Sequence, residues 1–336
     1  MSDRKYSNID LLKIVSIFLI ISHHFIYDAR VLNLVDETNL FYKFLYIGGK
    51  LGTAVFVLIT GFFLSKKDFE IKRILKLILK TDIYSYIFLI IYFCFFGTKV
   101  GLVEIIKCLL PVIGNRYWFV TAYVVLYFLT PYINIVIEQV DRRKFILLLV
   151  LILLLESILP MFGMKYASNG VVAFILYYLI GAYIRKFDLK VFKNNIFNFV
   201  AFFFFYFAMY VSVIIIYNLS SKVHFLVDKQ FYFTQIASFP VIMCATFLFL
   251  FFKNISIAKN KFLSVIASST LGIYLIHDNF FLKKTLFPYC FSFINQSDYY
   301  ILYSLLFIFL VIIVCSIVDV LFSKIIDLCI NSKKEH

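Results

Sequence analysis

The chain has 336 residues, of which 63% are hydrophobic, 20% are aromatic and only 15% are charged. Soluble domains are about 45–50% apolar and about 25% charged, so this composition excludes an ordinary soluble protein and predicts a polytopic membrane protein. The formal net charge of +14 is spread in short clusters between apolar runs. Such clusters are typical of loops that set membrane topology, and they argue against a nucleic-acid-binding stripe.

Ten apolar runs are long enough to cross a bilayer, which predicts an all-α integral membrane protein with about ten transmembrane helices. Their approximate bounds are 9–28, 41–64, 76–96, 117–137, 145–162, 169–187, 196–218, 232–252, 263–282 and 300–323. No soluble domain or linker-like segment interrupts them. We therefore expect residues 1–336 to form a single transmembrane domain.

Lysine and arginine residues concentrate in alternate connecting segments. The richer set lies after runs two, four, six and eight and at both ends of the chain. The terminal members are Arg4, Lys5, Lys324, Lys333 and Lys334, whereas Lys43 and Lys50 are assigned to the poorer set. Because cytoplasmic segments carry the excess of positive charge, both termini are predicted to be cytoplasmic.

The first run, "DLLKIVSIFLIISHH", carries Asp10, Lys13, His23 and His24 inside an otherwise apolar helix. A charge at bilayer depth costs from about 2.5 to over 10 kcal/mol, so such groups are usually kept for a task. At roughly 100° per residue, Lys13 and His24 fall on one stripe of the helix about 16 Å apart, with Asp10 near it. The spacing predicts that this stripe faces a cavity.

The adjacent histidines of this run, His23 and His24, point about 100° apart on a helix and cannot share one metal ion. We therefore expect no metal site there. One histidine should face the cavity and the other lipid, a loop or a neighbouring helix. The stripe makes His24 the inward-facing one.

The second run, "GGKLGTAVFVLITGFFL", is rich in glycine, which favours close packing of helices. In the fourth run, Arg116 and the only tryptophan, Trp118, are expected at the outer membrane interface. In the ninth, His277 is predicted at a depth similar to that of His24, with Asp278 beside it. Two histidines and a carboxylate at one depth indicate a polar cavity.

Four segments resemble the membrane acyltransferase 3 family, whose bacterial members O-acylate surface glycans. Its first helix has a basic residue, ten intervening residues and a histidine, matched here by Lys13 and His24, although many members have arginine first. The other matches are Thr60-Gly61-Phe62, then Trp118-Phe119 with Tyr127 and Pro131, and Gly272-Ile273-Tyr274-Leu275 with His277. One branch of the family has paired glutamates where Tyr123 and Val124 stand, so the chain departs from that branch.

The resemblance implies a multi-pass protein of the bacterial plasma membrane that moves an acyl group, usually acetyl, from acyl-coenzyme A to a sugar hydroxyl. The hydroxyl would belong to a cell-surface glycan or a lipid-linked saccharide handled on the outer side. Acyl-coenzyme A would be a co-substrate, and no permanently bound cofactor is expected.

Acyl transfer to an alcohol needs a base, and His24 is the candidate, either as general base or as a transient acyl acceptor. His277 would stabilise the oxyanion or orient the acceptor, with Asp278 tuning it. Lys13 would attract the phosphates of the coenzyme. The other expected contacts are Asp10, Lys66, Lys67 and Arg73 for the donor, and Arg116, Trp118 and Tyr274 for the acceptor.

The competing class is an exporter or flippase of a lipid-linked saccharide or polysaccharide. Intramembrane ionisable groups such as His24, His277 and Asp10 suit a transport pathway equally well. Against it, the sequence shows no convincing inverted repeat. A glycan polymerase is less favoured, because it would need a large charged external loop.

Overall fold

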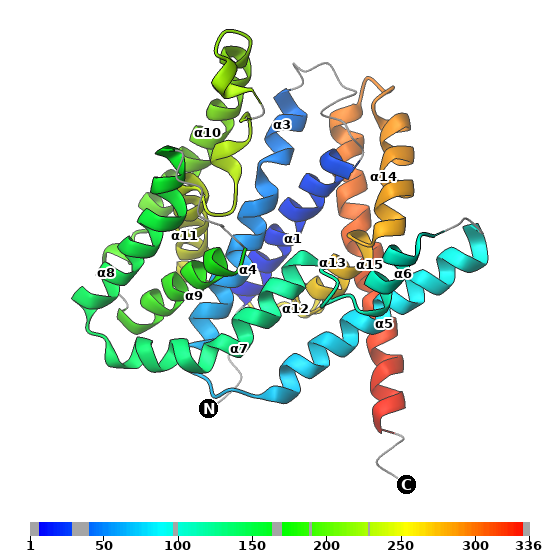
Figure 1. Ribbon diagram of the computed structural model, residues 1–336, viewed down its shortest axis with the longest axis horizontal. Helices are drawn as coiled ribbons and strands as arrows, with labels where there is room; N and C mark the ends of the chain where they lie inside the picture. Colours follow the sequence, from blue (N-terminus) through cyan, green and yellow to red (C-terminus); the bar gives the residue numbers. More distant parts are fainter. Residues whose placement is uncertain are drawn as a thin grey trace.

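The computed structural model describes residues 7–28, 40–96, 100–162, 170–187, 190–227 and 229–331, and within these ranges all regular structure is helical. Figure 1 shows the helices gathered in one bundle, in which α1 begins and α15 ends toward the same side. Of the terminal charges used to predict topology, Lys324 lies within the last helix, Tyr300–Asn331, and Arg4, Lys5, Lys333 and Lys334 lie outside the described residues.

The first half of the chain forms long helices joined by short segments. Their bounds are α1 Ser7–Asp28, α3 Leu40–Tyr46, α4 Gly48–Leu64, α5 Ile71–Phe96, α6 Leu102–Leu109, α7 Trp118–Gln139 and α8 Arg142–Leu153, followed by a π-helical turn Leu154–Ile158 and a 3-10 turn Leu159–Phe162. The second half contains α9 Gly170–Phe187, α10 Asn195–Ser220, α11 Phe239–Asn254, α12 Lys261–Ser268, α13 Thr270–His277, α14 Phe280–Ile294 and α15 Tyr300–Asn331, with 3-10 turns at Lys190–Lys193, His224–Leu226 and Tyr232–Thr234.

Seven segments of the described chain are long and apolar enough to cross a membrane. They are α1, α3 with α4, α7, α9, α10, Tyr232–Asn254 and α15 up to Lys324. The runs predicted at 76–96, 145–162 and 263–282 are not among them. The second run contains Lys43 and Lys50 within α3 and α4, so their assignment to connecting segments is wrong.

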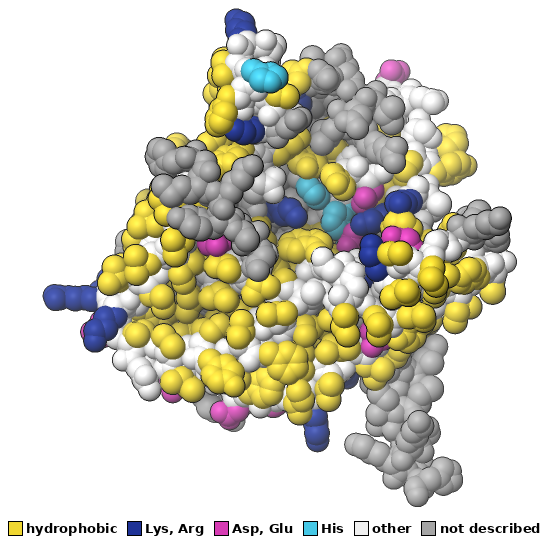
Figure 2. Space-filling view, in the orientation of Figure 1, with side chains coloured by type: hydrophobic (Ala, Val, Ile, Leu, Met, Phe, Trp, Pro, Cys, Tyr) yellow, Lys and Arg dark blue, Asp and Glu magenta, His cyan; other side chains and the backbone are white. Residues whose placement is uncertain are grey.

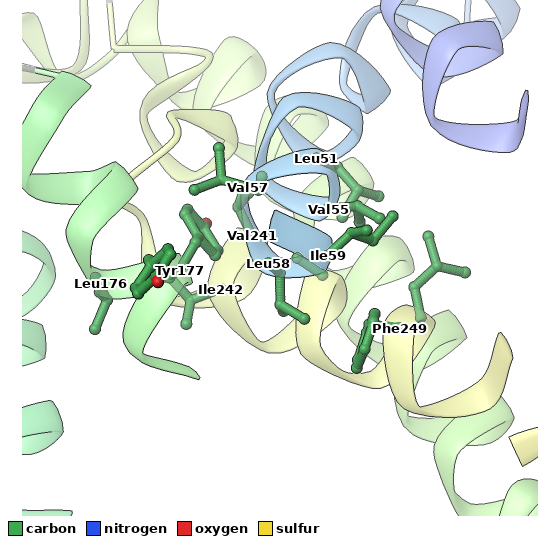
Figure 3. Close-up of a cluster of buried hydrophobic side chains, with 14 of the residues drawn as sticks. Leu51, Val55, Val57, Leu58, Ile59, Leu176, Tyr177, Val241, Ile242 and Phe249 are labelled. Atoms are coloured by element: carbon green, nitrogen blue, oxygen red, sulfur yellow. The ribbon is translucent and has the colours of Figure 1, made fainter. Parts of the chain in front are cut away.

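Helix α4 lies at the centre of the main apolar core. Figure 3 shows its side chains, among them Val57 and Leu58, beside Tyr177 of α9 and Ile242 of α11. Glycine permits the closest approach: a Cβ on Gly61 would overlap the backbone of Tyr178. The glycine-rich run therefore does pack helices together, as its composition predicts.

The single helix predicted over 263–282 is wrong, because the chain breaks there into α12, α13 and α14. The second break falls directly after His277, at Asp278 and Asn279. The side chain of Asn279 accepts a hydrogen bond from the backbone N–H of Phe281 at 3.1 Å and so caps the start of α14. An asparagine in this position satisfies a free helix-end donor, which favours a new helix start over a continuous helix.

Candidate active site

His24 and His277 meet at the middle of the bundle. His277 Nδ1 lies 2.6 Å from the carbonyl oxygen of Ile273, and because a carbonyl only accepts, this nitrogen carries the proton. The other nitrogen of neutral His277, Nε2, then accepts a hydrogen bond from His24 Nδ1 at 3.1 Å. This assignment from geometry leaves the lone pair on His24 Nε2 available as a base.

A buried carboxylate stands beside this pair. Asp278 Oδ1 lies 3.6 Å from His24 Nδ1 and 2.8 Å from the Nζ atom of Lys283, and Asp278 is only 5% exposed. The acid therefore faces the same imidazole nitrogen that donates to His277. A positive charge formed on His24 would be stabilised by this carboxylate.

The helix break that holds Asp278 is fixed by Tyr117, the residue directly before α7. Tyr117 donates its hydroxyl proton to the carbonyl of Leu275 at 3.2 Å and accepts a hydrogen bond from Asn279 Nδ2 at 3.0 Å. Because one phenol binds both sides of the break, the orientation of His277 and Asp278 depends on α7 as well as on their own segment.

His23 turns toward α4. Its Nδ1 donates to the carbonyl of Tyr46 at 2.7 Å, and its ring lies where a Cβ on Gly49 would be. The sequence predicted that one of the two histidines would meet a neighbouring helix, and the structure assigns that contact to His23. Both histidines nevertheless border the hollows described next.

Two hollows meet at these histidines. The outer hollow, of about 330 Å³, is lined by charged and polar groups that include Asp28, Arg116, Asp278 and Lys283. The inner hollow, of about 200 Å³, is lined largely by apolar groups such as those of Ile17, Phe56 and Leu271, with Tyr274 in its wall. Their shared walls are formed by His23, His24, Lys50 and Trp118. Figure 2 shows basic, acidic and histidine side chains gathered in a hollow near the middle of one face, with hydrophobic side chains around it.

The residues expected to contact the acceptor all border this region. Trp118 lines both hollows, and the Lys50 ammonium lies over its ring, 4.3 Å from the centroid. The Tyr274 ring packs edge-on against His277, with centroids 6.0 Å apart. Arg116 borders the outer hollow only.

Arg116 is held by a second acid. Its guanidinium pairs with Glu104 of α6 and stacks on the Phe280 ring, 4.0 Å from the centroid, with its side chain only 7% exposed. Burial raises the pKa of Glu104, but the ion pairs with Arg116 and Lys107 outweigh it and lower that pKa overall. Glu104 therefore stays ionised and anchors Arg116 at the rim of the hollow.

Asp10 and Lys13 line a different hollow. Their side chains are 3.6 Å apart, and together with Lys259 and Lys261 they border a basic cleft of about 590 Å³. Ile17 and Ile20, which follow on the same face of α1, border the inner hollow instead. Among the described residues the two hollows share no lining residue, so Lys13 and His24 border different hollows.

The other residues expected to contact the donor are Lys66, Lys67 and Arg73. Lys66 and Lys67 are exposed, and Arg73 forms an ion pair with Glu70 at 2.8 Å. Arg73 is exposed in the first turn of α5, and none of the three borders the inner hollow, the outer hollow or the basic cleft.

One group of described residues has ligand atoms close enough for a metal ion, namely His24, Asp28 and Asp278, whose atoms lie within 4.8 Å of one another. The sequence predicted no metal site. Lys283 already places a cation 2.8 Å from Asp278 Oδ1, at the same carboxylate. The cluster therefore holds a positive charge without any ion.

Sequence reasoning missed Lys50, Lys283, Asp28 and Tyr117. The only signal for Lys50 was a charge inside a glycine-rich apolar run, which is costly in a membrane and therefore informative. Nothing local marks Tyr117 or Lys283, because their roles arise from contacts across the bundle.

A family model described as an acyltransferase domain, that of the acyltransferase 3 family, matches residues 6–320. No curated protein and no solved structure matches the chain. The match covers nearly the whole chain, including every segment that lines the two hollows. The chain belongs to the acyltransferase 3 family and is a multi-pass membrane acyltransferase.

Proposed function

We propose that the protein transfers an acyl group, in the first instance acetyl, from acyl-coenzyme A to a hydroxyl of a cell-surface glycan or lipid-linked saccharide at the bacterial plasma membrane. The observation that carries this proposal is the position of His24 in the wall between two hollows of different chemistry. The apolar inner hollow suits an acyl group and its thioester arm. The polar outer hollow suits a hydroxylated acceptor.

The reaction needs a base and correct placement of the two substrates. General-base catalysis typically contributes about 10²–10⁴-fold, and positioning can supply about 7–11 kcal/mol. In this proposal His24 Nε2 removes the proton of the acceptor hydroxyl, and its Nδ1–H remains bonded to His277. Asp278 stabilises the imidazolium that forms, and the proton then passes to the departing thiolate.

The same proposal includes ten membrane crossings with both termini cytoplasmic. The common side at which α1 begins and α15 ends supports it (Figure 1). In this frame the basic cleft around Lys13 faces the cytoplasm, and its lysines are the proposed contacts for coenzyme A phosphates. Arg73, exposed in the first turn of α5, is a second proposed contact.

The test uses membranes from cells that express the protein and from cells that lack it. With acetyl-coenzyme A labelled in the acetyl group, label should enter a glycan fraction only in the first membranes. It should not do so when His24 is replaced by alanine. Equal labelling in both membranes would overturn the proposal.

A further inference from the structure

Lys50 is a positive charge in the wall of the site that no step above uses. It lies in the first turn of α4, half-buried, and borders both hollows together with His24 and Trp118. Its ammonium group lies over the Trp118 ring. Among the described residues, no carboxylate lies within ion-pair distance of it.

Placing this positive charge in the interior of the bundle costs free energy, and such charges are usually retained for a function. An ammonium group in the low-dielectric interior loses much of its hydration, and a cation–π contact returns only part of that free energy. The other cations of the outer hollow have acidic partners: Lys283 pairs with Asp278, and Arg116 pairs with Glu104. Among the described residues, Lys50 alone of the three cations of the outer hollow has no acidic partner, so its N–H donors are available to a bound molecule.

We propose that Lys50 is a catalytic residue that donates a hydrogen bond to the carbonyl oxygen of the acyl group and stabilises the oxyanion formed there. The inference rests on the acyl transfer proposed above. The reacting carbon must reach both the acceptor, in the outer hollow, and the thioester arm, in the inner one. Of the residues that border both hollows, Lys50 is the one with a permanent positive charge.

The acceptor oxygen forms a bond to the acyl carbon while its proton passes to His24 Nε2, and the carbonyl electron pair moves onto oxygen beside the Lys50 ammonium. Collapse of this intermediate restores the C=O bond and breaks the C–S bond. The thiolate of coenzyme A leaves and takes the proton from His24.

A fixed donor at a developing oxyanion affects the transition state more than the bound substrate. Loss of one such donor typically lowers kcat by about 10²–10³-fold. This separates an oxyanion role from simple attraction of the donor phosphates, which would change donor affinity instead.

The experiment measures release of coenzyme A thiol from acetyl-coenzyme A by the purified full-length protein, with water as the acceptor, so that no glycan is needed. The variants are Lys50→Met, which keeps the length of the side chain, and Lys50→Arg, which keeps its charge. The matched control is Lys43→Met: Lys43 is buried on α3 with its ammonium 4.0 Å from the Tyr217 ring centroid, but it borders neither hollow. Thermal unfolding and direct binding of coenzyme A are measured for each variant.

We expect Lys50→Met to lose about 100-fold in kcat with unchanged coenzyme A binding. Lys50→Arg should recover at least tenfold of that loss in kcat. The kcat of Lys43→Met should stay near that of the parent. A folded Lys50→Met protein within fivefold of the parent, or one that loses rate only through weaker coenzyme A binding, would overturn the role of Lys50 and leave the acyl transfer standing. A parent that neither binds coenzyme A nor releases it from acetyl-coenzyme A would overturn both.

Discussion

The Nδ1 atom of His24 lies 3.1 Å from the Nε2 atom of His277, although 253 positions separate these residues in the chain. The contact fixes a direction of proton donation that runs from His24 through His277 to the carbonyl of Ile273. It also leaves His24 Nε2 as the basic atom. The chemistry of the site therefore depends on a contact between the first helix and a short helix near the end of the chain.

Replacement of His24 by alanine should abolish acyl transfer while the protein stays inserted and folded. The ring supplies the base, so we expect a loss of about 10²–10⁴-fold in acetyl transfer from labelled acetyl-coenzyme A. His224→Ala is the matched control, because His224 is exposed in a 3-10 turn away from the hollows. Transfer by the His24 variant at the rate of this control would remove His24 from the mechanism.

Replacement of His277 should act through His24. In His277→Leu the acceptor for the His24 Nδ1 proton is lost, and the His24 ring is free to adopt the other tautomer or to rotate. We expect roughly a 10²-fold loss in kcat with little change in KM. His277→Gln offers a carbonyl oxygen in place of Nε2 and should retain more activity. Equal activity of the two variants, at equal thermal stability, would show that His277 only fills space.

The effects of replacing Asp278 and Lys283 on the free energy of unfolding should be strongly coupled. Asp278→Asn leaves the Lys283 ammonium without its acid, and loss of one partner of a buried pair typically costs about 3–5 kcal/mol of stability. The double variant Asp278→Asn with Lys283→Met removes both charges, so we expect it to unfold at a higher temperature than Asp278→Asn alone. Additive losses in stability would show that the two side chains act independently. Transfer should stay low in the double variant, because the carboxylate beside His24 is still missing.

The residues that bind the phosphates of the acyl donor can be identified by comparing coenzyme A binding in two variants. Lys13→Ala in the basic cleft and Arg73→Ala in the first turn of α5 each remove one positive charge. A charge-assisted contact is worth about 1.5–3 kcal/mol, so the residue that binds the coenzyme should weaken its binding by about 10- to 100-fold. Titration of coenzyme A into each purified variant measures this. Unchanged affinity in Lys13→Ala would remove Lys13 from donor binding, and unchanged affinity in Arg73→Ala would remove Arg73.

The sequence by itself determined that the chain is a polytopic membrane protein. It also singled out Lys13 and His24 as polar residues within the apolar first helix. Apolar runs predict membrane helices because bilayer thickness sets their length, and helical periodicity places Lys13 and His24 on one face. The glycine-rich run predicted close packing, which the contact of Gly61 with the Tyr178 backbone confirms. These properties depend on neighbours along the chain, which a sequence shows directly.

Only the tertiary structure decided how these residues are used. It broke the ninth run beside His277, brought His24 and Asp278 within 3.6 Å, and placed Lys13 and His24 in the walls of different hollows. It also placed Lys50 in the wall between two hollows instead of in a loop. Hydropathy cannot reveal such arrangements, because it reports whether a side chain avoids water and not which distant side chain, or which cavity, it meets across the bundle.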